Sequence, residues 1–164
     1  MSLVQDVFDA LASRKIMLAT AESCTGGMIA AAITDIAGSS TIFDRGFVTY
    51  SNEAKIAMLG VSMETLDRYG AVSEQTALEM ASGALEHSDA GIAVSVTGIA
   101  GPGGGSAEKP VGLVWFGIAG LGLPPAAQMR RFDGDRDAIR AAAVRTALEL
   151  VHARLDAVDQ SASR

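Results

Sequence analysis

The sequence contains few of the side chains that usually bind metals or activate nucleophiles. Cysteine occurs once in 164 residues, at Cys24. A single thiol excludes an internal disulfide and any zinc site built from several cysteines, and it fits a reducing compartment. The two histidines, His87 and His152, fall late in predicted helices. The sequence therefore shows no Ser-His-Asp triad, and we expect no metal site.

Positive charge is also scarce. The chain has 13 Lys and Arg against 19 Asp and Glu, for a formal net charge of −6. Binding to a phosphate backbone needs clustered positive charge, so we expect no nucleic-acid partner. Any anionic ligand must be held by a local pocket.

Long apolar runs are missing as well. The sequence begins Met1-Ser2-Leu3-Val4-Gln5-Asp6, without the basic region and apolar run of a signal peptide. No apolar stretch reaches membrane-spanning length without Gly, Pro or a charge. We therefore expect no membrane association and a cytoplasmic location.

What the chain does contain predicts a single α/β domain. Hydrophobic residues make up 49% and aromatic residues only 5%, while Ala and the 18 Gly are abundant, a composition that suits close helix-on-sheet packing. We expect a three-layer domain over residues 1–159, with a mixed or mostly parallel sheet of about five strands between helices, and a polar tail over 160–164. Periodicity predicts strands at 16–21, 43–50, 91–96, 111–119 and 127–132, and helices at 4–11, 25–36, 52–59, 63–69, 74–87 and from 135.

Two glycine-rich loops follow predicted strands, where α/β sheets bind ligands. The first, Glu22 to Gly27, sets Ser23 at the start of a helix, whose free N–H groups suit an oxyanion or a phosphate. The alternative is that Ser23 or Thr25 only caps the helix. The loop is not a G-x-S-x-G nucleophile elbow, because Ala21 stands where its first glycine belongs.

The second loop, Thr97 to Gly105, lets the backbone approach a ligand closely, although a flexible surface turn explains it equally well. It lacks the lysine of a Walker A loop and the last glycine of G-x-G-x-x-G. Lys55 and Lys109 are candidate bases or anion partners, and the alternative is that both lie in solvent. Cys24 is a weaker candidate nucleophile than Ser23, since no histidine is near in sequence.

Five motifs in series resemble the CinA C-terminal family of nicotinamide-nucleotide amidases. They are Ala21-Glu22-Ser23-Cys24-Thr25-Gly26-Gly27, Tyr50-Ser51-Asn52-Glu53-Ala54-Lys55, Gly70-Ala71-Val72-Ser73, Thr97-Gly98-Ile99-Ala100-Gly101-Pro102 and Lys109-Pro110-Val111-Gly112. The resemblance runs from about Leu3 to Leu155 and matches the stand-alone form of the domain. It implies hydrolysis of the carboxamide of nicotinamide mononucleotide to nicotinate mononucleotide and ammonia, with no cofactor.

The resemblance also implies roles for individual residues. Ser23 falls on the nucleophile, Tyr50 and Lys55 on the relay and general base, and Thr97 on the hydroxyl that opens the glycine loop. Without a histidine, a lysine must activate the serine, which requires a depressed lysine pKa. The residues expected to bind substrate are Cys24, Thr25, Gly26, Gly98, Gly101, Gly103, Gly104, Lys109, Arg136 and Arg140.

Two other functions remain open from the sequence. A non-catalytic module that binds a nucleotide or a DNA-repair partner would keep the glycine loop but would not need Lys55 beside Ser23. A different serine hydrolase would act on another small amide or ester in the same cleft. The apolar strands and Ala-rich helices also lead us to expect a homodimer or higher homo-oligomer.

Overall fold

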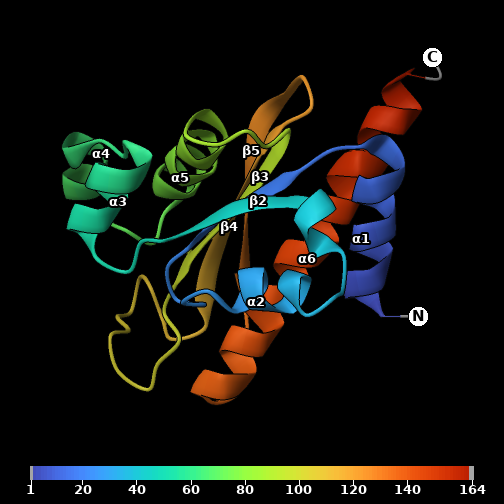
Figure 1. The fold of residues 1–164 in the computed structure, drawn as a ribbon. Helices are drawn as coiled ribbons and strands as arrows, with labels where there is room; N and C mark the ends of the chain where they lie inside the picture. Colours follow the sequence, from blue (N-terminus) through green and yellow to red (C-terminus); the bar gives the residue numbers. More distant parts are fainter. Residues whose placement is uncertain (1, 163–164) are drawn as a thin grey trace.

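The computed structural model describes residues 2–162 and shows an open β-sheet with helices packed on both faces (Figure 1). The strands are β1 (Leu18–Glu22), β2 (Phe43–Val48), β3 (Ile92–Gly98), β4 (Leu113–Gly120) and β5 (Leu123–Arg131). The helices are α1 (Leu3–Arg14), α2 (Met28–Thr34), α3 (Asn52–Leu59), α4 (Met63–Tyr69), α5 (Glu74–Glu86) and α6 (Arg136–Ala162), with a 3₁₀ turn η1 (Ser39–Thr41).

The sheet is mixed, in the order β2-β1-β3-β4-β5. β1 pairs in parallel with β2 and β3, whereas β4 is antiparallel to both β3 and β5. In the register, Glu22 at the end of β1 stands between Val48 of β2 and Val96 of β3. The carboxyl ends of β1, β2 and β3 therefore lie at one edge of the sheet. The three-layer α/β prediction is confirmed.

Two apolar cores lie between the sheet and its two helical layers, one on each face. α1, α2 and α6 pack on one face, where Leu18 of β1 joins the larger apolar cluster. The second cluster holds Ala19 and Ala21 of β1 with residues of α3, α4 and α5 on the other face. Because side chains alternate along a strand, Leu18, Thr20 and Glu22 point toward the α1, α2 and α6 layer.

Small residues let α5 lie very close to the sheet, as the composition predicted. A Cβ added to Gly117 of β4 would lie 2.2 Å from the carbonyl oxygen of Ala77 in α5. The hydroxyl of Ser95 donates to the same carbonyl at 2.6 Å. No larger side chain fits at position 117, so α5 is fixed tightly against β3 and β4.

The largest differences from the predicted element starts are at α2 and β5. Helix α2 begins at Met28 rather than at Thr25, because Gly26 and Gly27 adopt φ angles of +56° and +105°, outside the helical region. Strand β5 begins at Leu123 rather than at residue 127. It includes Pro124 and Pro125, which an edge strand tolerates because one side makes no ladder hydrogen bonds.

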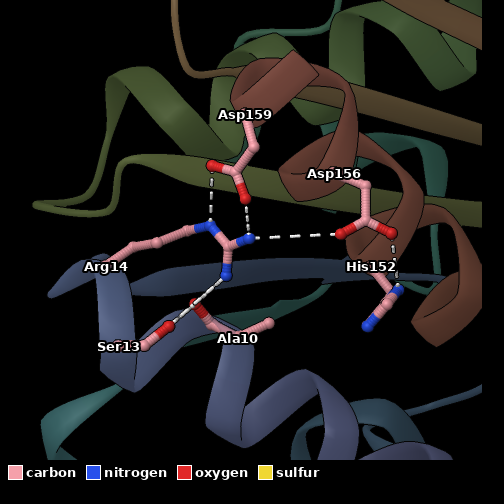
Figure 2. Close-up of polar contacts among 6 residues, drawn as sticks. All are labelled: Ala10, Ser13, Arg14, His152, Asp156 and Asp159. Atoms are coloured by element: carbon pink, nitrogen blue, oxygen red, sulfur yellow. Dashed lines mark hydrogen bonds and ion pairs between the residues drawn. The ribbon is translucent and has the colours of Figure 1, made fainter. Parts of the chain in front are cut away.

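The last turns of α6 are held by α1, as Figure 2 shows. Arg14 at the end of α1 contacts the carboxylates of Asp159 and Asp156, and its Nε donates to Asp159 at 3.2 Å. The helix continues to Ala162, into the segment expected to be a polar tail; residues 163–164 lie outside the described residues. Within residues 2–162, no helix is both long and apolar enough to span a membrane.

Candidate active site

A cavity of about 200 Å³ opens at the edge of the sheet where β1, β2 and β3 end. It brings together the four residues predicted to be catalytic, Ser23, Tyr50, Lys55 and Thr97. Its lining consists of Ser23, Cys24, Tyr50, Lys55, Ala71, Val72, Thr97, Gly98, Ala100 and Arg136.

At the floor of the cavity, Lys55 contacts Ser23 directly. The side-chain nitrogen of Lys55 donates to Ser23 Oγ at 3.0 Å. It also donates to the carbonyl of Thr49 at 2.8 Å and lies 3.4 Å from that of Tyr50. Ser23 is itself fixed, since its N–H donates to Val96 O at 2.9 Å. A buried serine hydroxyl and a buried amine therefore lie in hydrogen-bond reach, which is the arrangement that a serine nucleophile and its base require.

Helix α3 places the lysine. Ser51 caps this helix by accepting from the N–H of Ala54 at 3.0 Å, so the chain turns sharply inward after β2. Lys55 and Leu59, one turn apart, are the buried residues of α3. The Lys55 side chain is only 1% exposed. Burial disfavours its charged form and lowers its pKa below the ordinary value of 10.5, which is what a lysine base requires.

The turn that follows Ser23 is held from two sides. On one side the carboxylate of Glu22 accepts from Thr25 Oγ1 and from the first N–H groups of α2. On the other, Arg140 Nε donates to Cys24 O at 3.0 Å and Nη2 to Thr25 O at 3.4 Å. Within residues 2–162, the N–H groups of Cys24 and Thr25 have no oxygen acceptor, whereas that of Gly26 donates to Ser23 O. The donors left for a ligand therefore belong to the turn and not to α2.

Cys24 beside the nucleophile carries a protonated thiol. Burial raises its pKa to about 11, outweighing the opposing effects of the Cys24 backbone N–H and of the charge on Arg140. A thiol is a poor nucleophile until it loses its proton. Ser23 Oγ, in contrast, lies 3.0 Å from the Lys55 amine, a group that can take up its proton.

The mouth of the cavity is lined by Tyr50, Arg136 and Thr97. Tyr50 is 64% exposed, and its hydroxyl accepts from Arg136 Nη2 at 3.3 Å. Arg136 Nη1 donates to the carbonyl of Gly101 at 2.8 Å, which joins the second glycine loop to α6. Thr97 is buried and donates its hydroxyl hydrogen to Ala71 O at 2.8 Å, so its lone pairs remain available as acceptors.

Comparison with known proteins identifies the family of this chain. The family model described as "CinA C-terminal domain" matches residues 1–155. The chain belongs to the CinA C-terminal domain family. It is 62% identical over 131 residues to a protein of Enterobacter agglomerans named nicotinamide-nucleotide amidohydrolase PncC, covering 80% of each chain. A protein of the same name from Escherichia coli K12 is 56% identical over 149 residues, covering 91% of this chain and 90% of the relative.

Solved structures show the same relationship. The crystal structure of competence/damage inducible protein CihA from Agrobacterium tumefaciens superposes with a TM-score of 0.90 at 56% identity. The match covers 94% of this chain and 93% of that one. The fold of this CinA C-terminal domain is therefore shared along almost its whole described length.

Several predicted binding residues lie beside the cavity rather than in its wall. Gly103 and Gly104 belong to the outer part of the second loop, and Lys109 lines a neighbouring hollow, where its amine donates to Tyr69 O at 2.5 Å. Arg140 touches the turn after Ser23 and not the cavity. Gly98 lies in the wall, and Gly101 reaches the site through Arg136.

Sequence reasoning did not single out Glu22, although it ends an otherwise uncharged strand in this CinA domain. A carboxylate at the last position of a buried strand was the available signal. Among residues 2–162, no three His, Cys, Asp or Glu side chains gather in a way that could hold a metal ion.

Proposed function

We propose that this chain hydrolyses the carboxamide of nicotinamide mononucleotide to nicotinate mononucleotide and ammonia, with Ser23 as nucleophile and Lys55 as base. The observation that carries the proposal is the buried 3.0 Å contact between Lys55 Nζ and Ser23 Oγ. The names of the Enterobacter agglomerans and Escherichia coli relatives support the choice of substrate.

The first half of the reaction forms an ester on Ser23. Neutral Lys55 removes the hydroxyl proton while Ser23 Oγ attacks the carboxamide carbon, and the carbonyl becomes an oxyanion. The N–H groups of Cys24 and Thr25, which have no oxygen acceptor in the part of the chain that the structure describes, are suited to stabilise that oxyanion. The Lys55 ammonium then gives its proton to the leaving nitrogen, and ammonia departs.

Water completes the cycle. Lys55, neutral again, removes a proton from a water molecule, which attacks the ester carbon and forms a second oxyanion. The bond to Ser23 Oγ breaks, and Lys55 returns the proton to that oxygen. The product is formed as the carboxylic acid and loses its proton to solvent, and the enzyme regains its starting protonation state.

The same geometry leads us to propose a different role for Tyr50. Lys55 touches Ser23 without a bridge, and the Tyr50 hydroxyl contacts Arg136 instead. We assign Lys55 as the direct base, and Tyr50 with Arg136 to the substrate's phosphoribosyl end. Thr97, with its hydroxyl hydrogen committed to Ala71 O, is placed to accept a carboxamide N–H.

The burial of Lys55 favours an enzyme over a binding module. Removing an amine from water costs free energy, and a surface lysine would attract a phosphate without that cost. A buried lysine with a lowered pKa beside a serine has a clear use in proton transfer and none in simple binding.

The deciding experiment is incubation of the purified chain with nicotinamide mononucleotide. We expect ammonia and nicotinate mononucleotide in equal amounts, with a Ser23→Ala preparation as the control for contaminating amidases. Release no faster than in that control would overturn the proposal. The cytoplasmic location, the absence of a nucleic-acid partner and the homo-oligomer stay predictions, the last to be checked by light scattering.

A further inference from the structure

We infer that Glu22 is a positioning residue for catalysis, whose ionised carboxylate sets Ser23 in line with Lys55. This inference rests on the proposed function of Ser23 as the nucleophile. Glu22 itself does not line the cavity, so it acts through the turn that it holds.

The position of Glu22 in the sheet explains why it can act on that turn. It is the last residue of β1, is 1% exposed, and points toward the layer that contains α2. The next residue is Ser23, whose backbone is bonded to β3. Burying a carboxylate at this position costs desolvation free energy, which hydrogen bonds from the protein must offset.

Three donors meet that carboxylate. Oε1 accepts from Thr25 Oγ1 at 2.6 Å and from the N–H of Ile29 at 2.9 Å, and Oε2 accepts from the N–H of Ala30 at 3.1 Å. Helix α2 has Gly27 at its N-cap, which offers no capping side chain. Glu22 supplies the missing cap from outside the helix, and a negative charge is favoured at that end.

The result is a closed structural unit around the nucleophile. Glu22 comes directly before Ser23, and its carboxylate binds Thr25 within the turn and α2 beyond it. The glycines at 26 and 27 would otherwise leave this turn free to move. Tying both ends of the turn to one carboxylate keeps Ser23 Oγ at 3.0 Å from the Lys55 amine.

The chemistry of the three partners suits a side chain with two acceptor oxygens. All three groups that face Glu22 are donors. A glutamine has one acceptor oxygen, and its NH₂ group would face an N–H group. An isosteric but neutral side chain therefore cannot replace the carboxylate.

The test compares Glu22→Gln with the matched control Glu79→Gln. Glu79 also accepts from a backbone N–H, that of Ser62 at 2.9 Å, and from a threonine hydroxyl, that of Thr65 at 2.5 Å, but does so at the start of α4. We expect Glu22→Gln to lower kcat about 100-fold, the effect of a displacement near 1 Å, and to change KM less than about threefold. The pH at which activity rises should stay unchanged, because Glu22 does not contact Lys55. Glu79→Gln should keep kcat.

A kcat within about threefold of the wild type for Glu22→Gln would overturn the inference, as would equal losses in the two glutamine variants. Should Glu22→Gln fail to fold, Thr25→Val and Thr25→Ser replace it. Valine removes the hydroxyl that binds Glu22, whereas serine keeps it. The kcat of Thr25→Val should therefore be well below that of Thr25→Ser. Equal values of kcat for this pair would again contradict the role of Glu22.

A substrate-independent measurement separates this inference from the amidase proposal. A dialkyl fluorophosphonate phosphorylates an activated serine oxygen with loss of fluoride, and intact mass reports the rate. If the wild type releases no ammonia but is labelled at Ser23, the amidase proposal fails while the inference about Glu22 remains testable. In that case we expect Glu22→Gln to be labelled about 100-fold more slowly than the wild type. Equal labelling rates overturn the inference, and a wild-type chain that neither reacts nor deamidates overturns both proposals.

Discussion

Lys55 donates a hydrogen bond to Ser23 across 32 positions of sequence, from the first turn of α3 to the turn that follows β1. Both side chains are buried, and the amine is also bonded to the carbonyl of Thr49. The contact is formed because β1 and β2 are parallel neighbours that end at the same edge of the sheet.

Replacing Ser23 with alanine should remove at least about 10⁴-fold of kcat, as loss of a nucleophile does in other serine hydrolases. The fold should persist, since one lost hydrogen bond costs about 1 kcal/mol and Lys55 keeps its bond to Thr49. Ammonia release and urea unfolding measure the two effects. Near-normal turnover in this variant would contradict the assignment of the nucleophile.

Lys55→Arg should be as inactive as Lys55→Ala, because a guanidinium stays protonated and cannot accept the serine proton. In the wild type, kcat/KM should rise with pH as Lys55 loses its proton, with a midpoint below 10.5, since burial lowers this pKa. A pH series of initial rates checks both points. An active arginine variant without the rising limb would indicate a purely electrostatic lysine.

The same lowered pKa makes the stability of the protein depend on pH. The unfolded chain holds the Lys55 proton up to its ordinary pKa of 10.5, while the folded chain releases it earlier. Wild-type stability should therefore rise, relative to Lys55→Met, as pH increases from the folded pKa toward 10.5. Urea midpoints of both proteins at several pH values test this, and a gap that stays constant would show that Lys55 titrates normally.

Cys24→Ala should keep most of the activity. The thiol has a pKa of about 11 and is protonated at neutral pH, and the backbone N–H proposed for the oxyanion is still present in alanine. Steady-state kinetics decide the matter. A loss as large as that of Ser23→Ala would transfer the role of nucleophile to the cysteine.

Arg136→Gln should raise KM for nicotinamide mononucleotide about tenfold to a hundredfold, the usual cost of a lost charge-assisted contact. Nicotinamide riboside lacks the phosphate, so we expect the wild type to turn it over more slowly and Arg136→Gln to change that rate little. Parallel assays on the two substrates give the comparison. Equal losses of kcat/KM on the two substrates would indicate that Arg136 only supports the structure of the cavity mouth, through its contacts with Gly101 and Tyr50.

The fold was largely predictable because β1, β3 and β4 are short, largely apolar runs bounded by polar or glycine-rich loops. Strand β3 and helix α5 were found nearly at their observed bounds for this reason. The start of α2 was misplaced because the φ angles of Gly26 and Gly27 are decided by the turn that Glu22 holds, and not by apolar periodicity. The first residues of β5 were missed because prolines argue against a strand unless it lies at an edge.

The candidate site was predictable in its residues but not in its contacts. Sequence spacing alone left Lys55 with a solvent alternative, and only the parallel pairing of β1 with β2 brings it to Ser23. The resemblance of the Tyr50 to Lys55 motif suggested a relay, but no spacing rule shows that the tyrosine hydroxyl turns toward Arg136. Arg140 shows the same limit, because its partners are backbone carbonyls far away in the sequence.

Arg136 and Arg140 lie one turn apart on α6, so they share one side of a rigid helix. Arg136 contacts Tyr50 and the carbonyl of Gly101 in the Thr97–Gly105 loop. Arg140 contacts the turn that follows Ser23. A shift or rotation of this helix would move the wall around the substrate and the support of Ser23 together. Changes in substrate preference that arise by mutation are therefore expected in side chains at the mouth, since adjusting the backbone of α6 to admit a new substrate would at once misalign the reacting hydroxyl.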